Sequence, residues 1–416
     1  MLKQTGLLYN KFSRLNLYCS SSFALAGVCI YIVSLALPFK YRWDISLLLL
    51  ALISVLSIVP YIQKKSYTGL PFIFPVSAFL IVTTISILAS EDLGRSIRMA
   101  VPLLPALLLF FLIAGIFQGT KDIRLLYFTF SIVALWLALI LLLASWKNSA
   151  MEPFAWISII GNPVLVVKND VTFFAIIVPL SLALLLRHPR SIFGVVAMLS
   201  MLLSIVVIGI FQSRVAMLTL IVSVACFFSF FRPKLGFMCG FTVLIIILLI
   251  DSLMGFPLIG RYIHHWDGSG RIPLWLSAWE MFLDAPILGK GPHTFVIFYN
   301  SYLHNLDLPS WLFVDPRVVP WAHNLYLEVL AEQGIIGIMA FCFLLANGLS
   351  GMQKFRYTTS SEIKILGYGA LSALVSFCFS AIFELTFLRL WVVLVMFTLL
   401  GVIGKLLLLL QEKEVE

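Results

Sequence analysis

The segment IFGVVAMLSMLLSIVVIGIF, residues 192–211, decides the class of fold because it contains 20 residues without a charge. A bilayer core about 30 Å thick is crossed by about 20 apolar residues in a helix. The whole chain shares this character: 61% of its 416 residues are hydrophobic, 11% are charged and the mean hydropathy is +1.06. Soluble domains carry about 25% charged residues. The sequence therefore predicts an all-α polytopic membrane protein.

Further runs of the same kind predict about twelve transmembrane helices. The predicted spans are 17–39, 45–62, 70–90, 99–117, 125–145, 171–186, 192–211, 215–231, 235–250, 323–349, 365–383 and 390–410. They divide the chain into helices 1–9 within residues 1–252, a large loop over residues 253–322, and helices 10–12 within residues 323–416.

The distribution of Lys and Arg predicts the orientation, since cytoplasmic loops carry an excess of basic residues. With both termini in the cytoplasm, the majority of Lys and Arg fall on the cytoplasmic side, and the large loop lies outside. The net charge of +9 is then partly a consequence of topology. No long basic run interleaved with aromatic residues occurs, so nucleic acid is not an expected partner.

The loop over residues 253–322 is rich in Trp, Pro, His and Gly, and loops of this length are usually functional. Within it, SGRIPLWLSAWEMFLDAP (residues 269–286) predicts a helix, because Pro273 lies near the first turn and Pro286 follows the end. The apolar residues that recur at helical spacing are Leu274, Trp275, Ala278, Trp279 and Phe282. This helix is predicted to lie in the plane of the lipid headgroups.

A second unusual stretch, PWAHNLYLEVLAEQGIIG (residues 320–337), places polar residues at the start of a predicted span. A helix from His323 to Leu349 would be about 40 Å long and would exceed the hydrocarbon core by nearly two turns. We expect the excess to protrude outward, with His323 in the first turn and Glu328 and Glu332 one to two turns deeper. Such a helix predicts a site between the membrane and the outer compartment.

Arg214 stands between two apolar spans in IGIFQSRVAML and is predicted to lie close to the outer membrane face. An arginine well inside a span costs about 2.5 to 3.5 kcal/mol on insertion scales. One interpretation is a snorkelling or turn-capping side chain. The other is an anion clamp, because a guanidinium binds phosphate through two parallel charge-assisted hydrogen bonds.

Arg271 opens the predicted loop helix, where free N–H groups and the helix dipole favour anions. It is either a solvated loop charge or, together with Arg214, part of a phosphate site. His323 is a candidate general base, because a neutral imidazole with a pKa near about 6.5 accepts a proton at neutral pH. The alternative for His323 is an interfacial histidine with satisfied hydrogen bonds.

Three further charged residues are predicted to support the site. Glu328 is expected to stabilise the helix or an arginine. Glu384 and Arg389 flank the last outer turn, either as supporting partners of the site or as a loop ion pair that contributes little.

No metal or cofactor site is indicated. The outer histidines fit no compact zinc motif. The glycines of GKGPHTF (residues 289–295) lack the leading strand and third glycine of a dinucleotide fingerprint. No D-x-D sequence occurs, so arginines would have to hold a diphosphate.

Three segments occur in a recognisable order around the large loop: SRVAMLTL (213–220), RIPLWLSAWEMFLDAPILGKGPHTF (271–295) and AHNLYLEVLAEQGIIG (322–337). Over roughly residues 160–400 the chain resembles the O-antigen ligase and polymerase superfamily of bacterial inner-membrane glycosyltransferases. The resemblance implies that Arg214, Arg271 and His323 are essential, and that a polyprenyl-diphosphate-linked glycan is transferred without metal and with inversion.

The resemblance also implies a GT-C-like architecture with a periplasmic active site. Lys168 and Asp170, in VVKNDVTFF (166–174), lie where relatives carry a polar outer segment. They are further candidates, Lys168 for diphosphate binding and Asp170 as a supporting residue.

Together these features favour an O-antigen ligase, which transfers undecaprenyl-diphosphate-linked O-polysaccharide to a sugar hydroxyl of the lipid A core. Its expected partners are the lipid-linked O-antigen, the lipid A core oligosaccharide and membrane lipids. The alternative is an O-antigen polymerase, which performs the same chemistry with another lipid-linked glycan as acceptor. A lipid-linked glycan transporter ranks lower, because the conspicuous charges cluster at one face and not through the middle of several spans.

Overall fold

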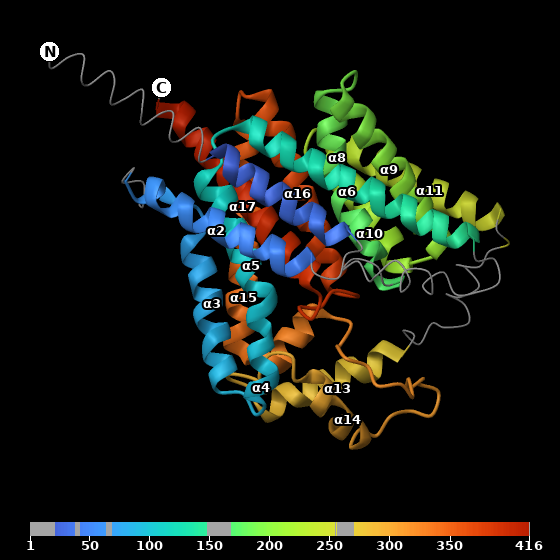
Figure 1. The fold of residues 1–416 in the computed structure, drawn as a ribbon. Coiled ribbons are helices and arrows are strands. Elements are labelled where there is room, and N and C mark those ends of the chain that lie inside the picture. The colour runs from blue at the N-terminus through green and yellow to red at the C-terminus, as the bar shows by residue number, and fades with distance from the viewer. Residues whose placement is uncertain are drawn as a thin grey trace, which may run out of the picture.

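The computed structural model describes residues 21–37, 42–63, 69–147, 168–253, 255 and 270–415. Within these ranges all regular structure is helical (Figure 1). A bundle of long helices makes up most of the molecule. The helices α13 (Arg271–Asp284) and α14 (Phe295–His304) lie at its lower edge in Figure 1, far from the C-terminal end of α17 (Leu390–Val415).

The remaining elements follow the predicted spans closely. Those before residue 150 are the helix Ser21–Ala36, α2 (Arg42–Gln63), α3 (Ile73–Leu88), α4 (Leu93–Ser96), η2 (Ile97–Met99), α5 (Ala100–Phe111), η3 (Leu112–Ile116) and α6 (Thr120–Lys147). Those after it are η4 (Lys168–Val171), α8 (Thr172–Arg187), α9 (Ile192–Phe211), α10 (Arg214–Ser229), α11 (Pro233–Leu253), α15 (Leu325–Tyr357) and α16 (Ser361–Ala381).

Seven helices in the described part of the chain are long and apolar enough to cross a membrane. They are Leu93–Ile116, Thr120–Leu143, Ile192–Phe211, Pro233–Leu253, Leu325–Tyr357, Ser361–Ala381 and Leu390–Glu412. Shorter apolar helices of 10–17 residues coincide with the other predicted spans. The polytopic helical membrane fold is therefore confirmed. That all twelve segments cross the membrane, and that residues 253–322 face the periplasm, stay predictions.

The helix α8 lies at the centre of the bundle. Its side chains from Thr172 to Leu184 are all buried, and it packs against α6, α9, α10 and α16. Gly369 of α16 permits a close approach, because a Cβ there would lie 2.9 Å from the Cβ of Ala183. Small residues at helix contacts are typical of membrane bundles. The burial of α8 fixes the position of η4, which directly precedes it and contributes to the site described below.

The start of α15 differs from the prediction. The helix begins at Leu325, so the prediction that His323 lies in its first turn is wrong. Asn324 is the N-cap, and its Oδ1 accepts hydrogen bonds from the backbone N–H groups of Tyr326 and Leu327. Asn is a preferred N-cap residue because it satisfies N–H groups that the first turn leaves free. His323 therefore precedes the helix and adopts a left-handed φ of 54°.

The helix α15 also breaks at Gly334, whose φ of 64° and ψ of −166° are not helical. The segment 286–291 crosses α15 at this point. The N–H of Ile335 donates to the carbonyl of Pro286 over 2.8 Å, and the N–H of Gly291 donates to the carbonyl of Glu332 over 2.8 Å. These bonds satisfy backbone groups that the break removes from the helical pattern.

Glycine is required on both sides of this crossing. A Cβ on Gly334 would lie 2.3 Å from the carbonyl oxygen of Ile287, and a Cβ on Gly289 would lie 2.2 Å from the carbonyl carbon of Glu332. Both glycines also have positive φ, which other residues adopt at a cost. The glycines of GKGPHTF therefore allow the segment 286–291 to pack directly against the broken helix.

The predicted loop helix is confirmed as α13. Its buried face differs from the predicted one: the buried residues are Pro273, Leu274, Ser277, Ala278 and Met281. Trp279, predicted on the apolar face, is 45% exposed. The buried face packs against α14 and α15 in a second apolar cluster, which orients the first residue of α13 toward the turn before α17.

Candidate active site

Arg271 and His323 are brought together by one carboxylate. Arg271 Nη2 donates to Glu384 Oε2 over 2.8 Å, and His323 Nδ1 lies 3.7 Å from Glu384 Oε1. The side chain of Glu384 is 6% exposed, whereas that of Arg271 is 24% exposed. Arg271 therefore remains accessible to a ligand while its partner is buried.

Each of these residues is positioned by a different element. Arg271 is the first residue of α13, after Gly270 with φ of 77°. Glu384 lies in the turn between α16 and α17. His323 is held by the left-handed backbone just before the N-cap of α15. The juxtaposition of Arg271 and His323 depends on these three elements meeting at one end of the bundle.

A second ion pair lies beside the first. Arg389 Nη1 is 3.0 Å from Asp170 Oδ1, and their side chains are 9% and 3% exposed. The same carboxylate oxygen accepts a 2.8 Å hydrogen bond from Trp391 Nε1. A buried ion pair needs further hydrogen bonds to offset its desolvation, and Trp391 supplies one. Asp170, Arg389 and Trp391 thus tie η4 to the start of α17.

Trp321 connects the two pairs, and the sequence reasoning missed it. The guanidinium carbon of Arg389 lies 4.7 Å from the centroid of the Trp321 ring. Trp321 Nε1 donates to His323 Nδ1 over 3.2 Å. The signal available in the sequence was a tryptophan two residues before the candidate base, in PWAHN.

Burial shifts the pKa values of the two central groups of the site. Burial lowers the pKa of His323 to about 3, and the charges of Arg271 and Arg389 act in the same direction. Burial raises the pKa of Glu384 to about 7, although both arginines oppose this shift. The imidazole is therefore neutral at physiological pH, with two guanidinium groups close enough to oppose its protonation.

Glu328 supports the turn that carries Glu384 and Arg389. Its Oε1 accepts hydrogen bonds from Thr386 Oγ1 over 2.6 Å and from the N–H of Phe387 over 3.2 Å. Glu328 is 2% exposed. It therefore holds the turn against α15.

Glu332, one turn further along α15, serves the crossing segment. Its two oxygens accept the N–H groups of His293, over 2.8 Å, and Phe295, over 2.9 Å. Phe295 is the first residue of α14, so the carboxylate lies at a helix N-terminus, where negative charge is favourable.

Arg214 takes no part in the contacts described above. It is the half-buried first residue of α10, after the N-cap Ser213. Because α8 and α9 are joined by a short turn and α9 packs back onto η4, the start of α10 lies at the end of the bundle that carries Asp170. That Arg214 approaches Arg271 stays a prediction. Lys168 opens η4, and its side chain lies outside the described part of the structure.

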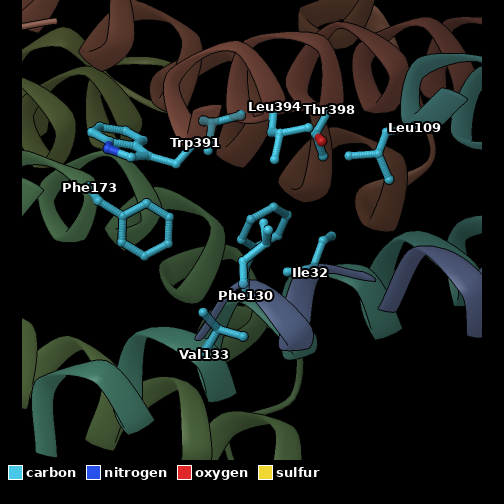
Figure 2. A pocket seen from close by; sticks show the side chains of 10 residues that line it. Ile32, Leu109, Phe130, Val133, Phe173, Trp391, Leu394 and Thr398 are labelled. Carbon is cyan, nitrogen blue, oxygen red and sulfur yellow. The ribbon is translucent and has the colours of Figure 1, made fainter. Parts of the chain in front are cut away.

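A small apolar pocket lies on the side of Trp391 that faces away from Asp170. Its lining residues are Ile32, Leu35, Leu109, Phe130, Val133, Phe173, Trp391, Leu394, Val395 and Thr398. Figure 2 shows Trp391 and Phe173 at one end of it and Leu109 at the other. Trp391 therefore separates an apolar pocket inside the bundle from the buried Asp170.

Among the described residues, no three His, Cys, Asp or Glu side chains gather in a way that could hold a metal ion. The polar atoms that converge at the site come mainly from arginine, histidine and tryptophan side chains around Glu384 and Asp170. That the reaction needs no metal stays a prediction.

Comparison with known proteins identifies one family. Residues 199–342 match the family described as O-antigen ligase. The matched range contains Arg214, Arg271 and His323, whereas Asp170, Glu384 and the residues after it lie outside. A search of curated proteins found no match to the chain.

Proposed function

We propose that this chain, which belongs to the O-antigen ligase family through residues 199–342, transfers undecaprenyl-diphosphate-linked O-polysaccharide to a sugar hydroxyl of the lipid A core. The active site is proposed to face the periplasm, in the bacterial inner membrane. The observation that carries the proposal is the convergence of Arg271, Glu384 and His323 over 2.8 Å and 3.7 Å. A cation that is open to ligand and a neutral imidazole are the groups that this reaction needs.

The chemistry is a single displacement at the anomeric carbon of the donor sugar. The acceptor oxygen forms a bond to this carbon while the bond from the carbon to the diphosphate oxygen breaks, which inverts the configuration. A diphosphate leaves with its own negative charge, so the larger requirement is to stabilise that charge. Fixed cations in a partly dry site do this effectively. Arg271, Arg214 and Lys168 are the proposed diphosphate contacts.

His323 is the proposed general base that takes the proton of the acceptor hydroxyl. Its pKa of about 3 in the empty site would make it a weak base. A bound diphosphate brings negative charge next to Arg271, and a nearby negative charge favours the protonated imidazole. Donor binding is therefore expected to raise the pKa of His323 toward the range in which it accepts a proton effectively.

The test uses the lipopolysaccharide of a strain that lacks this chain and carries variants of it. Loss of His323 in His323→Ala, or of the guanidinium in Arg271→Ala, is expected to leave polymerised, lipid-linked O-antigen while the lipid A core stays uncapped. Core that carries single repeat units would instead indicate the polymerase. Core with a normal ladder of O-antigen in both variants would contradict the proposed site.

A further inference from the structure

The Nδ1 atom of His323 lies between a hydrogen-bond donor and a hydrogen-bond acceptor. Trp321 Nε1 is 3.2 Å away and Glu384 Oε1 is 3.7 Å away. An indole N–H can only donate, and the carboxylate of Glu384 accepts in the ionised form that its ion pair with Arg271 favours. Nδ1 therefore bonds to Trp321 when it carries no proton and to Glu384 when it carries one. The choice of partner decides which ring nitrogen of the neutral imidazole is free to act as a base.

The indole donor is anchored independently of the imidazole. Arg389 lies over the ring of Trp321 at 4.7 Å, and a cation on an aromatic face is favourable. Arg389 is held in turn by Asp170 at 3.0 Å, and Asp170 by Trp391 at 2.8 Å. These contacts restrain the plane of the Trp321 ring, whose N–H points toward His323.

Only one of the two carboxylate oxygens of Glu384 accepts a hydrogen bond from the described residues. Its Oε2 accepts the hydrogen bond from Arg271, whereas its Oε1 is buried and has no hydrogen-bond partner among the described residues. An unsatisfied buried acceptor is costly. A proton on Nδ1 of His323 would satisfy Oε1 after a small approach from 3.7 Å. Besides Arg271 and Glu384, the charged groups that act on His323 are Arg389 and Asp315.

We propose that Trp321 is a positioning residue that keeps the ring proton of His323 on Nε2 while no diphosphate is bound. When a diphosphate binds Arg271, Nδ1 of His323 carries the proton and donates it in a hydrogen bond to Glu384. The second step rests on the proposed function, because a diphosphate is the ligand that competes with Glu384 for Arg271. One proton leaves Nε2 and one joins Nδ1 by exchange with water, so the ring stays neutral. Nε2 then has a free lone pair for the acceptor hydroxyl. The base becomes available only when the donor substrate is bound.

Histidine-selective ¹⁵N NMR of the full-length protein in lipid bilayers tests this without turnover. Protonated and unprotonated ring nitrogens give separate signals, and the signals of His323 are those lost in His323→Gln. In the empty wild-type protein we expect the proton on Nε2. Added inorganic pyrophosphate is expected to move it to Nδ1. Trp321→Phe, which keeps an aromatic face for Arg389 but removes the N–H, should show the proton on Nδ1 without pyrophosphate.

Trp279→Phe is the matched control, because Trp279 is 45% exposed on α13 and is expected to leave the tautomer unchanged. A proton on Nδ1 in the empty wild-type protein overturns the proposal, and this measurement needs no variant beyond the assignment. An unchanged tautomer in folded Trp321→Phe also overturns it. Pyrophosphate that binds, as seen by ³¹P NMR, without moving the proton overturns the role of Glu384. Failure of pyrophosphate to bind counts against the proposed diphosphate site, while the comparison of empty wild type with Trp321→Phe still decides the role of Trp321.

Discussion

Arg271 and Glu384 form a 2.8 Å hydrogen-bonded ion pair although 113 residues separate them in the chain. Arg271 begins α13, and Glu384 lies in the turn before α17. The free oxygen of the same carboxylate faces His323. One buried carboxylate therefore sets the distance between the cation and the base that we propose for the reaction.

Loss of Arg271 should impair glycan transfer. In Arg271→Ala we expect kcat/KM of the purified protein to fall by about 10²- to 10³-fold, the usual effect of removing one group that stabilises transition-state charge. Arg271→Lys should recover only part of it, because lysine lacks the planar fork of arginine. Arg317→Ala is the control, since Arg317 lies between α14 and α15 and its side chain is 84% exposed. Equal rates for Arg271→Ala and Arg317→Ala would contradict the prediction.

Removal of the charge on Glu384 should lower kcat more than it raises KM. Glu384→Gln keeps the shape of the side chain but leaves the imidazolium that forms during transfer without a counter-ion. We expect a loss of about tenfold or more in kcat, which is below the full effect of a positioned base. Steady-state kinetics with the lipid-linked donor measure both constants. Glu280→Gln on α13 is the comparison, and a KM effect alone in Glu384→Gln would argue for a purely binding role.

The free energy of unfolding should depend on pH through His323. Its folded pKa of about 3 lies below the unfolded value of 6.5, so the unfolded chain binds the proton more tightly. The contribution of His323 to the free energy of unfolding is therefore fully present above about pH 6.5 and is lost as the pH falls toward 3. Glu384 acts in the opposite sense: its pKa is raised from 4.5 to about 7, so its contribution is present below about pH 4.5 and lost as the pH rises to 7.

The two contributions offset each other in the wild-type protein, and a variant separates them. When the pH is lowered from 7 to 5, the Tm of the wild type should fall relative to the Tm of His323→Gln. Thermal unfolding in detergent at the two pH values measures the difference. The same difference in Tm at both values would show that the pKa of His323 is not depressed.

The crossing of α15 by residues 286–291 should not tolerate a side chain at Gly334. In Gly334→Ala the Cβ would lie 2.3 Å from the carbonyl oxygen of Ile287, at a φ of 64°. Strain of this kind costs about 1–3 kcal/mol, so we expect a lower Tm and weaker activity. Gly209→Ala is the matched control, because Gly209 is helical and a Cβ there meets nothing within 4 Å. A Tm for Gly334→Ala at or above that of Gly209→Ala would contradict the crossing.

Transfer should continue in excess EDTA, because the proposed diphosphate contacts are arginine and lysine side chains. The measurement is glycan transfer by purified protein before and after chelation. Activity that is lost with EDTA and restored by a divalent ion would overturn the metal-independent mechanism.

Local features of the chain were predictable where their cause is local. The span at residues 192–211 coincides with α9, because a bilayer requires each crossing segment to satisfy its own backbone hydrogen bonds. The loop helix α13 was predicted from its flanking residues for a similar reason. The helix α15 begins two residues later than the apolar run predicts, because Asn324 caps it.

The partners of individual charged residues could not be predicted from the sequence. Glu384 and Arg389 were expected either to support the site or to pair with each other, yet each pairs with a residue from a distant element. For Trp321 the sequence offered only its place two residues before His323, because its contacts are with a guanidinium above the ring and an imidazole beside it. Side-chain contacts between distant segments leave no periodicity in the sequence.

The sequence by itself determined that the chain is a helical membrane protein and where most of its helices lie, and it singled out Arg214, Arg271 and His323 as candidate site residues. Apolar run length and helix-end residues carry that information, since a helix in lipid is stabilised within its own segment. Only the tertiary structure decided that Arg271, His323 and Glu384 share one site, and that Arg389 pairs with Asp170 and lies over the ring of Trp321. Their meeting depends on the packing of α8, α15 and α17 and on the break at Gly334, which are properties of the assembled bundle.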